Sequence, residues 1–247
     1  MTESHQLLEQ QLIQLRLPAM RQEYVAQAKV AIAKGLGHID YLANLIEAET
    51  QQRHQRSVQR RLREARFPYL KTLDDYDFTY PKRIDRMKLK DIFTLHFLDH
   101  HANVIIVGTC GLGKTHLAIA LGHHACQHGY NASFTTAIKM INILTAAQAA
   151  HRLDQELQRY LKPALLVIDE LGYLPIDKYG ADLLFQVISG RYERGSIVLT
   201  TNRIFKEWPQ IFNNDAILTS AVLDRLVHHH ELVIIEGNSY RMRKPNE

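Results

Sequence analysis

The fold of this chain is decided by the eight residues Gly108-Thr109-Cys110-Gly111-Leu112-Gly113-Lys114-Thr115. They fit the phosphate-binding pattern G-x-x-x-x-G-K-[ST] without a mismatch, between an apolar strand candidate and a helical run. Glycines in such a loop let backbone N–H groups wrap a phosphate chain, and the helix start adds its positive dipole end. The pattern predicts a nucleotide site rather than a plain glycine-rich turn, with Lys114 on the outer phosphates and the Thr115 hydroxyl on Mg²⁺. Nucleotide contacts are expected from Gly108, Thr109, Cys110, Gly111, Leu112, Gly113, Lys114, Thr115 and His116.

Size and composition are those of an ordinary globular protein. The 247 residues are 46% hydrophobic and 23% charged, enough for one large domain or for a core with a smaller appendage. The net charge is +4, and its excess is uneven, because residues 1–91 carry 16 Lys/Arg against 12 Asp/Glu while residues 92–247 carry 14 of each. The front segment therefore favours an anionic partner, with a simple solubility effect as the alternative.

The two cysteines, Cys110 and Cys126, are too few for a disulfide framework, and a bridge at Cys110 would obstruct the phosphate loop. They are expected to be reduced thiols of a cytoplasmic protein. We find no secretory signal at the N-terminus and no apolar run approaching the length of a membrane span, so no membrane association is expected.

The chain is expected to have three parts. Residues 1–66 have helical periodicity and predict a small all-helical N-terminal domain, whose third helix is capped by Asp40. Residues 67–91 mix prolines, aromatics and acids and predict an extended linker leaning on the next domain. Residues 92–247 alternate short apolar strands with helices, which predicts an α/β core with a parallel five-stranded sheet flanked by helices. The expected strands are 103–107, 132–135, 164–168, 196–200 and 231–235. The expected helices are 115–128, 138–160 with a break, 181–193 and 216–228.

Two of these strands end in polar residues that suit phosphate chemistry. Asp169 and Glu170 follow a buried run, and ligands in open α/β sheets bind beyond the carboxyl ends of the strands. We expect Asp169 to face Mg²⁺ and Glu170 to polarise a water in line with the γ-phosphate, the alternative being a solvated acidic turn. Asn202, after the next strand, is expected to hold the same water, although asparagine is also common in turns.

The sequence favours ATP over GTP as the nucleotide. The Asn-Lys-x-Asp element that recognises guanine in GTPases should follow a late strand, and Thr201-Asn202-Arg203-Ile204 stands there instead. Arg225, on the helix before the last strand, is by itself most consistent with a surface ion pair to Asp224 or Glu231.

The order of these motifs resembles the AAA+ ATPases. The strings around Gly111-Leu112-Gly113-Lys114-Thr115, Asp169-Glu170-Leu171-Gly172-Tyr173-Leu174-Pro175 and Gly237-Asn238-Ser239-Tyr240-Arg241 together resemble IstB-type transposition helpers and the related bacterial helicase loaders. The resemblance implies a homo-oligomeric ring or spiral with ATP at subunit interfaces. It implies that Arg225 is an arginine finger acting on the neighbouring subunit's γ-phosphate and that Arg241 is a sensor arginine. Thr109, where relatives usually carry proline, departs from the pattern at a variable position.

Several basic residues are candidates for contacting DNA. Arg53, Arg56, Arg60 and Arg63 share one face of a helix, opposite an apolar seam, which suits a phosphate backbone as well as a solvated surface. Further candidates are Lys82, Arg83 and, from the family resemblance, the segment from Lys139 to Arg159. Without interleaved aromatics, contact with the duplex backbone, tolerant of sequence, is expected rather than single-strand stacking.

His228-His229-His230 is not expected to bind metal, because adjacent histidines point in different directions and no cysteine or acid cluster lies beside them in the sequence.

The leading hypothesis is therefore an Mg²⁺-dependent ATPase that oligomerises on duplex target DNA and delivers it to a partner transposase. The alternative is a replicative helicase loader that binds a hexameric helicase and single-stranded DNA. Two further hypotheses are a DNA-coating scaffold that hydrolyses ATP negligibly and a small-molecule kinase. A kinase would need an arginine-bearing lid over a second substrate pocket, and we find no such segment in the sequence.

Overall fold

The computed structural model describes residues 3–240, and the chain divides into two compact units, Met1–Arg60 and Arg61–Glu247. Among residues 3–240, none of the helices combines the length and the hydrophobicity that a membrane-spanning segment needs.

The first unit consists of α1 (Glu3–Gln14), α2 (Pro18–Lys34) and most of α3 (His38–Ala65). Its helices are joined at Glu49, a buried carboxylate that accepts the Ala19 and Met20 amides at 2.8 and 3.2 Å and pairs with Arg53 at 2.9 Å. Burial opposes the ionised form, but the guanidinium and the amides outweigh it and lower the pKa of Glu49. The same arrangement satisfies two of the orphan N–H groups at the start of α2.

The expected start of the third helix is wrong by a few residues. Asp40 lies inside the first turn, because α3 already begins at His38. Its carboxylate reaches back to accept the Gly37 amide at 3.3 Å, so it satisfies a backbone donor from within the helix rather than from the position before it. At its other end α3 buries Ala65 in the core of the second unit.

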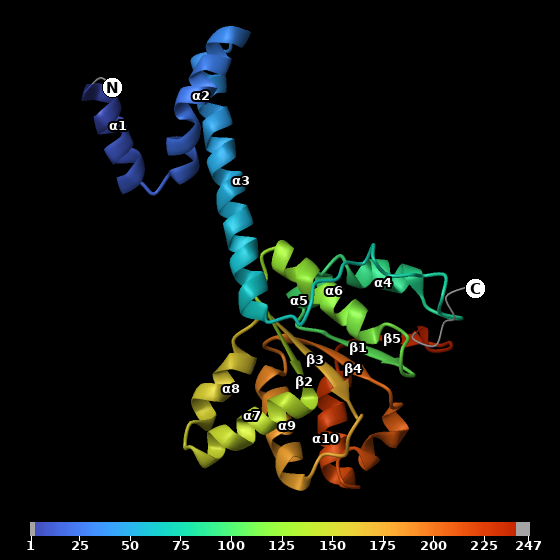
Figure 1. Cartoon of the computed structure of the whole chain (residues 1–247). Coiled ribbons are helices and arrows are strands. Elements are labelled where there is room, and N and C mark those ends of the chain that lie inside the picture. The colour runs from blue at the N-terminus through green and yellow to red at the C-terminus, as the bar shows by residue number, and fades with distance from the viewer. Residues whose placement is uncertain (1–2, 241–247) are drawn as a thin grey trace. The chain divides into compact units, whose positions relative to one another are not determined.

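The second unit is built on a five-stranded parallel sheet, as the sequence predicts (Figure 1). The strand order is β2-β3-β4-β1-β5, so the strand that leads into the phosphate loop lies inside the sheet with a neighbour on each side. Its strands are β1 (Asn103–Gly108), β2 (Ala132–Thr136), β3 (Leu165–Leu171), β4 (Ser196–Thr201) and β5 (His230–Ile235). All five carboxyl ends therefore meet at one edge.

Helices cover both faces of this sheet (Figure 1). One face packs on α6 (Lys114–Gln127) and the other on a layer that includes α7 (Ala137–Ala149) and α9 (Lys178–Arg191). Strand side chains alternate between two apolar clusters, with Val104 and Ile106 on the α6 side and Ile105 on the other. The remaining elements are α4 (Arg86–Ile92), α5 (His96–Asp99), α8 (Leu153–Leu161), η1 (Phe205–Gln210) and α10 (Ala216–Val227). The predicted break in the 138–160 helix is confirmed, since α7 and α8 are separate.

The segment expected to be an extended linker is only partly extended. Residues 67–85 form turns and irregular backbone, but residues 86–92 form α4, which Asp85 caps by accepting the Lys88 amide at 2.9 Å. The irregular part packs into the core around α6 through Phe67, Leu73, Tyr76 and Phe78. It is therefore an integral layer of the second unit.

Arg191 joins the start of β4 to the segment before β3. The guanidinium is 1% exposed and donates to five backbone carbonyl oxygens, at 2.7 to 3.4 Å. Burial lowers the pKa of Arg191 to about 10, so the side chain stays charged at neutral pH. The acceptors are the carbonyls of Tyr160, Leu161, Pro163, Ala164 and Ser196.

Candidate nucleotide-binding site

The phosphate loop runs from the end of β1 to the first turn of α6. Gly111 and Gly113 have φ of +79° and +80°, a backbone that side-chain-bearing residues rarely adopt, and Gly113 is the N-cap of α6. Lys114 is buried, and its ammonium donates to the Thr109 carbonyl at 2.8 Å and to the Tyr173 hydroxyl at 3.3 Å. The loop thus places helix-start amides and an ammonium group at the carboxyl edge of the sheet.

Asp169, at the end of β3, lies beside this loop as predicted. Its Oδ1 accepts the Thr115 hydroxyl at 3.1 Å and, through a short hydrogen bond, the hydroxyl of Thr200 on β4. The carboxylate is 3% exposed. A carboxylate and a hydroxyl oxygen side by side are the hard donors that Mg²⁺ prefers, so the donor set fits that ion. Thr200 was not predicted, since a threonine in an apolar strand reads as core.

Glu170 has an unusual backbone. Its φ is +63°, and the pairing of β3 with β4 shifts register between Ile168 and Leu171, so the strand bulges at this residue. The Glu170 amide donates to the Thr200 hydroxyl at 3.0 Å, which fixes the bulge, while the side chain is exposed and lines the nucleotide cavity. A left-handed conformation costs energy in a glutamate, and such strain gathers at functional sites.

Asn202 follows β4, as expected. Its Oδ1 is buried and has no hydrogen-bond partner among the residues that the structure describes. Buried side-chain oxygens are nearly always satisfied, so an orphaned one beside a candidate site is a place for a bound water or ligand group. This observation fits the predicted water-holding amide.

A cavity of about 350 Å³ opens from the phosphate loop. The Tyr76 hydroxyl donates to the Leu112 carbonyl at 2.9 Å, its ring lies edge-on to His116 at 5.4 Å, and burial raises its pKa to about 12. On the Glu170 side, burial and contact with Cys110 raise the pKa of the Tyr173 hydroxyl. The wall is aromatic and comes from segments far apart in the chain: Tyr69, Tyr76, Tyr80, Tyr173 and Tyr240. Apart from the tyrosines in segment 67–85, nothing in the sequence indicates this wall.

Of the two arginines of the family resemblance, Arg225 does not line this cavity. Arg225 lies in the last turn of α10, where its guanidinium stacks on Phe185 at 4.8 Å and donates to the Ala221 carbonyl at 3.0 Å. The ion pair with Glu231 considered from the sequence is not what forms, because Glu231 pairs with Lys88 at 3.0 Å. Arg241 lies outside the described residues.

The candidate DNA-binding residues fall into two groups by their environment. Arg56, Arg60, Arg63, Lys82, Arg83 and Lys139 are exposed. Arg53 is also partly exposed, but it is engaged inside the first unit, pairing with Glu49 and donating to the Arg16 carbonyl at 2.6 Å. All four arginines of the α3 stripe are therefore exposed, but Arg53 is already held by partners within the first unit.

Lys139 opens onto a groove that the sequence did not predict. The groove has a volume of about 870 Å³ and runs along the edge strand β2, between it and helices α7 and α8. Its charged residues are predominantly basic, with Glu64 and Glu156 opposing Arg66, Lys139, Arg152, Arg159 and Lys162. The wall offers no broad aromatic platform for bases, because Phe134 and Tyr160 are its two aromatic residues.

Comparison with known proteins identifies the family of this chain. The family model described as IstB-like ATP binding protein matches residues 10–247. Among curated relatives, a protein named as an ATP-binding protein of insertion sequence IS5376 from Geobacillus stearothermophilus is 40% identical over 93% of this chain and 91% of its own. A second relative, named as an ATP-binding protein of insertion sequence IS21 from Pseudomonas aeruginosa, is 38% identical over 96% of this chain and 89% of its own.

Solved structures of low sequence identity share the fold. The DnaC helicase loader superposes with a TM-score of 0.54 at 23% identity, covering 67% of this chain and 96% of its own. DnaI superposes with a TM-score of 0.57 at 16% identity, covering 67% of this chain and 90% of its own. DnaA bound to AMPPCP and single-stranded DNA superposes with a TM-score of 0.56 at 20% identity, covering 68% of this chain and 50% of its own. The second unit thus has the AAA+ architecture that the sequence predicts.

Proposed function

Because the chain belongs to the IstB-like ATP-binding proteins of insertion sequences, we propose that it is an Mg²⁺-dependent ATPase that oligomerises on duplex DNA and delivers this target to a partner transposase. Belonging to the family implies a helper role in transposition.

ATP binding is supported by the phosphate loop and its aromatic wall. Helix-start amides and the Lys114 ammonium face the same cavity, which suits a polyphosphate. The tyrosines opposite the loop offer flat apolar surfaces against which a purine can stack. Thr115 and Asp169 would hold the metal ion, which neutralises charge on the phosphates when bound.

Hydrolysis is supported by the environment of Glu170 and Asn202. The Thr200 hydroxyl fixes both the Asp169 carboxylate and the Glu170 backbone, so the two acids of one strand end have different tasks. Asp169 stays buried on the metal side, and Glu170 extends into the cavity as general base for a water. The unsatisfied Oδ1 of Asn202 accepts a hydrogen bond from that water. The hold of the Thr200 hydroxyl on the Asp169 carboxylate and on the Glu170 backbone is the observation on which the proposal of hydrolysis chiefly depends.

Assembly through shared sites is supported by the position of Arg225. It lies at the end of α10, next to the start of β5, whereas the phosphate loop follows the end of β1, which runs parallel to β5. Arg225 is therefore at the sheet edge opposite its own phosphate loop and would serve the nucleotide of a neighbouring subunit. A finger supplied in trans makes hydrolysis depend on assembly.

DNA binding is supported by the basic groove along β2 and by the exposed arginines of α3. Both surfaces are charged and lack an aromatic platform, so they suit the phosphate backbone of duplex DNA rather than unstacked bases. Binding of this kind tolerates sequence and weakens steeply as salt rises.

The test of the enzymatic proposal separates binding from turnover. Glu170→Gln should bind ATP with unchanged affinity and lower DNA-stimulated hydrolysis by at least about a hundredfold, the scale of a lost general base. Glu207→Gln, in η1, is the matched control and should leave turnover unchanged. Normal turnover by Glu170→Gln would remove this residue from the chemistry.

The test of the assembly uses two inactive variants together. Arg225→Ala should bind ATP but not hydrolyse it, and Lys114→Ala should fail to bind it. Mixed oligomers of the two should recover part of the activity, because an Arg225→Ala subunit with an intact nucleotide loop can receive the finger of its neighbour. No recovery of activity, in material that co-assembles, would contradict a finger acting in trans.

The alternative function, a helicase loader, has its own test. Tight binding to a hexameric helicase, together with a preference for single-stranded DNA, would favour a helicase loader instead.

A further inference from the structure

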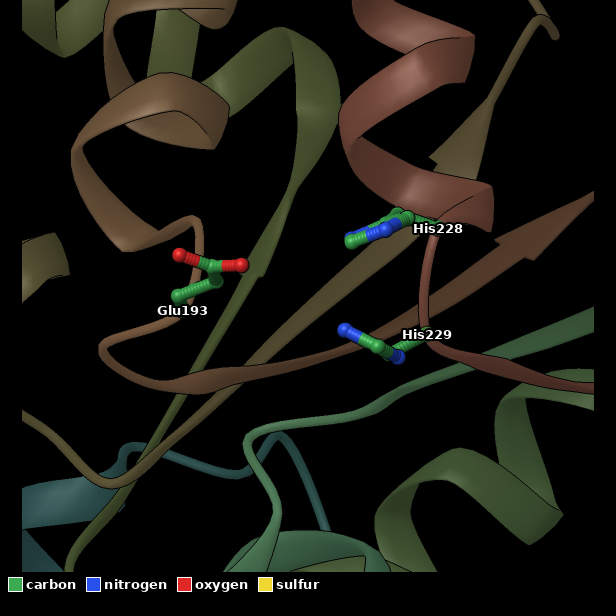
Figure 2. Close-up of side chains that lie close together, drawn as sticks. All are labelled: Glu193, His228 and His229. Atoms are coloured by element: carbon green, nitrogen blue, oxygen red, sulfur yellow. The ribbon is translucent and has the colours of Figure 1, made fainter.

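Two histidines and a glutamate that are far apart in the sequence converge on the surface of the second unit (Figure 2). Glu193 lies in the turn between α9 and β4, and His228 and His229 lie in the connection from α10 to β5. One ligand atom from each lies within 4.8 Å of the others, and all three side chains are exposed. The acid comes from a different turn, so its nearness to the histidines could not be predicted from their sequence neighbours.

The backbone beneath this cluster is fixed by Asn103, the first residue of β1. Its side-chain amide donates to the Leu226 carbonyl at 3.0 Å, and its Oδ1 accepts the Ile197 amide at 2.9 Å. Its own backbone amide donates to the His229 carbonyl at 2.8 Å. Buried Asn103 therefore ties the connection before β5 to the start of β4, so the two sides of the cluster are held in register while the ligand side chains stay accessible.

The chemistry around the histidines suits a cation. His228 directly follows the last turn of α10, where the unpaired carbonyls carry partial negative charge. The Tyr192 hydroxyl lies 2.9 Å from Nδ1 of His228. With Nδ1–H donating to that hydroxyl, Nε2 keeps its lone pair for an ion, which is the outer-sphere arrangement common at metal-bound histidines. Asp224, exposed one turn before His228, adds negative charge, and Arg225 opposes it.

We propose that Glu193, His228 and His229 bind a first-row transition-metal ion of the zinc class. Two imidazole nitrogens and one carboxylate oxygen form a ligand set found at zinc sites, with the remaining position left to water. Imidazole ligands select such ions against Mg²⁺ and Ca²⁺, which prefer oxygen. The ligand atoms must approach one another more closely than they do now, and exposed side chains can change rotamer to do so.

The site is separate from the nucleotide cavity. It precedes the amino ends of β4 and β5, while the phosphate loop follows the carboxyl end of the parallel strand β1. A bound ion would link the two turns that flank the start of β1, which stabilises the folded unit without touching the nucleotide. Arg225 and Glu193 line the same small cavity as His229, so the ion would lie beside the α10 residue proposed to act on a neighbour.

The experiment uses untagged full-length protein, stripped of metal and then equilibrated with Zn²⁺ or Co²⁺. We expect Zn²⁺ to raise the melting temperature and Co²⁺ to give the visible d–d absorption of a nitrogen and oxygen site without a thiolate band. His229→Gln and Glu193→Gln should each lower the affinity for Zn²⁺ by about tenfold or more and remove most of the shift. ATP affinity should be unchanged in both variants.

The matched control is His128→Gln, at another pair of neighbouring histidines in this unit. His124 lies in the last turn of α6 and His128 is its C-cap, with ring centroids 4.1 Å from each other, so this pair is a competing candidate for the ion. This variant should keep the full response to Zn²⁺. The proposal is overturned if His128→Gln abolishes the response, if His229→Gln and Glu193→Gln both retain it, or if wild-type protein shows neither the shift nor the Co²⁺ absorption.

Discussion

Replacing Thr200 by valine is the sharpest test of how the two acids of β3 are held. Valine keeps the shape of the side chain, which is 1% exposed, and removes only its hydroxyl. That hydroxyl donates to Oδ1 of Asp169 and accepts the Glu170 amide at 3.0 Å. Thr200→Val therefore takes one donor from the buried carboxylate and leaves the bulged amide without its acceptor.

The expected loss of stability is worked from these two bonds. A hydrogen bond to a charged group contributes about 2 kcal/mol, and a partly buried amide left without its acceptor costs about 1 kcal/mol more. The free energy of unfolding should fall by about 3 kcal/mol, which lowers the melting temperature by roughly 6–12 °C for a unit of this size. ATP turnover should fall more than ADP affinity, because the Glu170 backbone is no longer held.

The assay is thermal unfolding followed by steady-state ATP hydrolysis, with Thr135→Val as the matched control. Thr135 is also a buried strand threonine, but its hydroxyl donates only to the adjacent Thr136 carbonyl, at 3.1 Å. Its replacement should cost about 1 kcal/mol or less and leave turnover intact. Equal effects of the two substitutions on melting and on turnover would refute the bridging role of Thr200.

Three further predictions concern other parts of the second unit. Gly113→Ala should weaken ATP binding by at least about tenfold in a titration with ATP, because at φ +80° the added Cβ would lie 2.6 Å from the Tyr76 ring. The matched control is Gly129→Ala, where φ is +98° and the space around the added Cβ is open. This control has the backbone strain without the clash and should leave the affinity for ATP unchanged. Arg191→Met should lower the free energy of unfolding in urea by about 3–5 kcal/mol, because five carbonyls lose a charged donor. Burial lowers the pKa of His123 below 6.5, so the unfolded chain binds its proton more readily. Stability should therefore fall as the pH drops below about 6.5, and His123→Gln should flatten that dependence in urea titrations at pH 7.5 and 5.5.

The sequence predicts what is local or strongly periodic in this fold. The phosphate loop is a contiguous pattern, and the five strands are short apolar runs, so both could be placed from the chain alone. Asp169 and Glu170 could be placed at the same edge because parallel strands share the direction of their carboxyl ends. The start of α3 was misplaced, because an aspartate can accept a backbone N–H either from the N-cap position or from inside the first turn. Asp40 accepts the Gly37 amide from inside the first turn.

What the sequence could not predict depends on contacts between distant segments. Thr200 resembles any strand threonine until β3 and β4 are paired with a bulge. Tyr76 becomes part of the cavity wall only because the irregular segment 67–85 packs over α6. Glu193 meets His229 because Asn103 fixes the turns before two strands on either side of β1. None of these pairings leaves a periodic or contiguous signature in the chain.

The contact between Tyr76 and the phosphate loop has a consequence for recombination among relatives. Tyr76 closes on Leu112 and Gly113, and farther along the chain the Tyr240 amide reaches the Gly111 carbonyl at 2.9 Å. A chimera that joined foreign front helices at residue 92 would separate the loop from its tyrosine, although every motif residue would be inherited intact. Crossovers that preserve nucleotide binding should therefore fall ahead of Phe67. The segment that must be inherited as a whole is longer than the sequence motifs by which the nucleotide site is recognised.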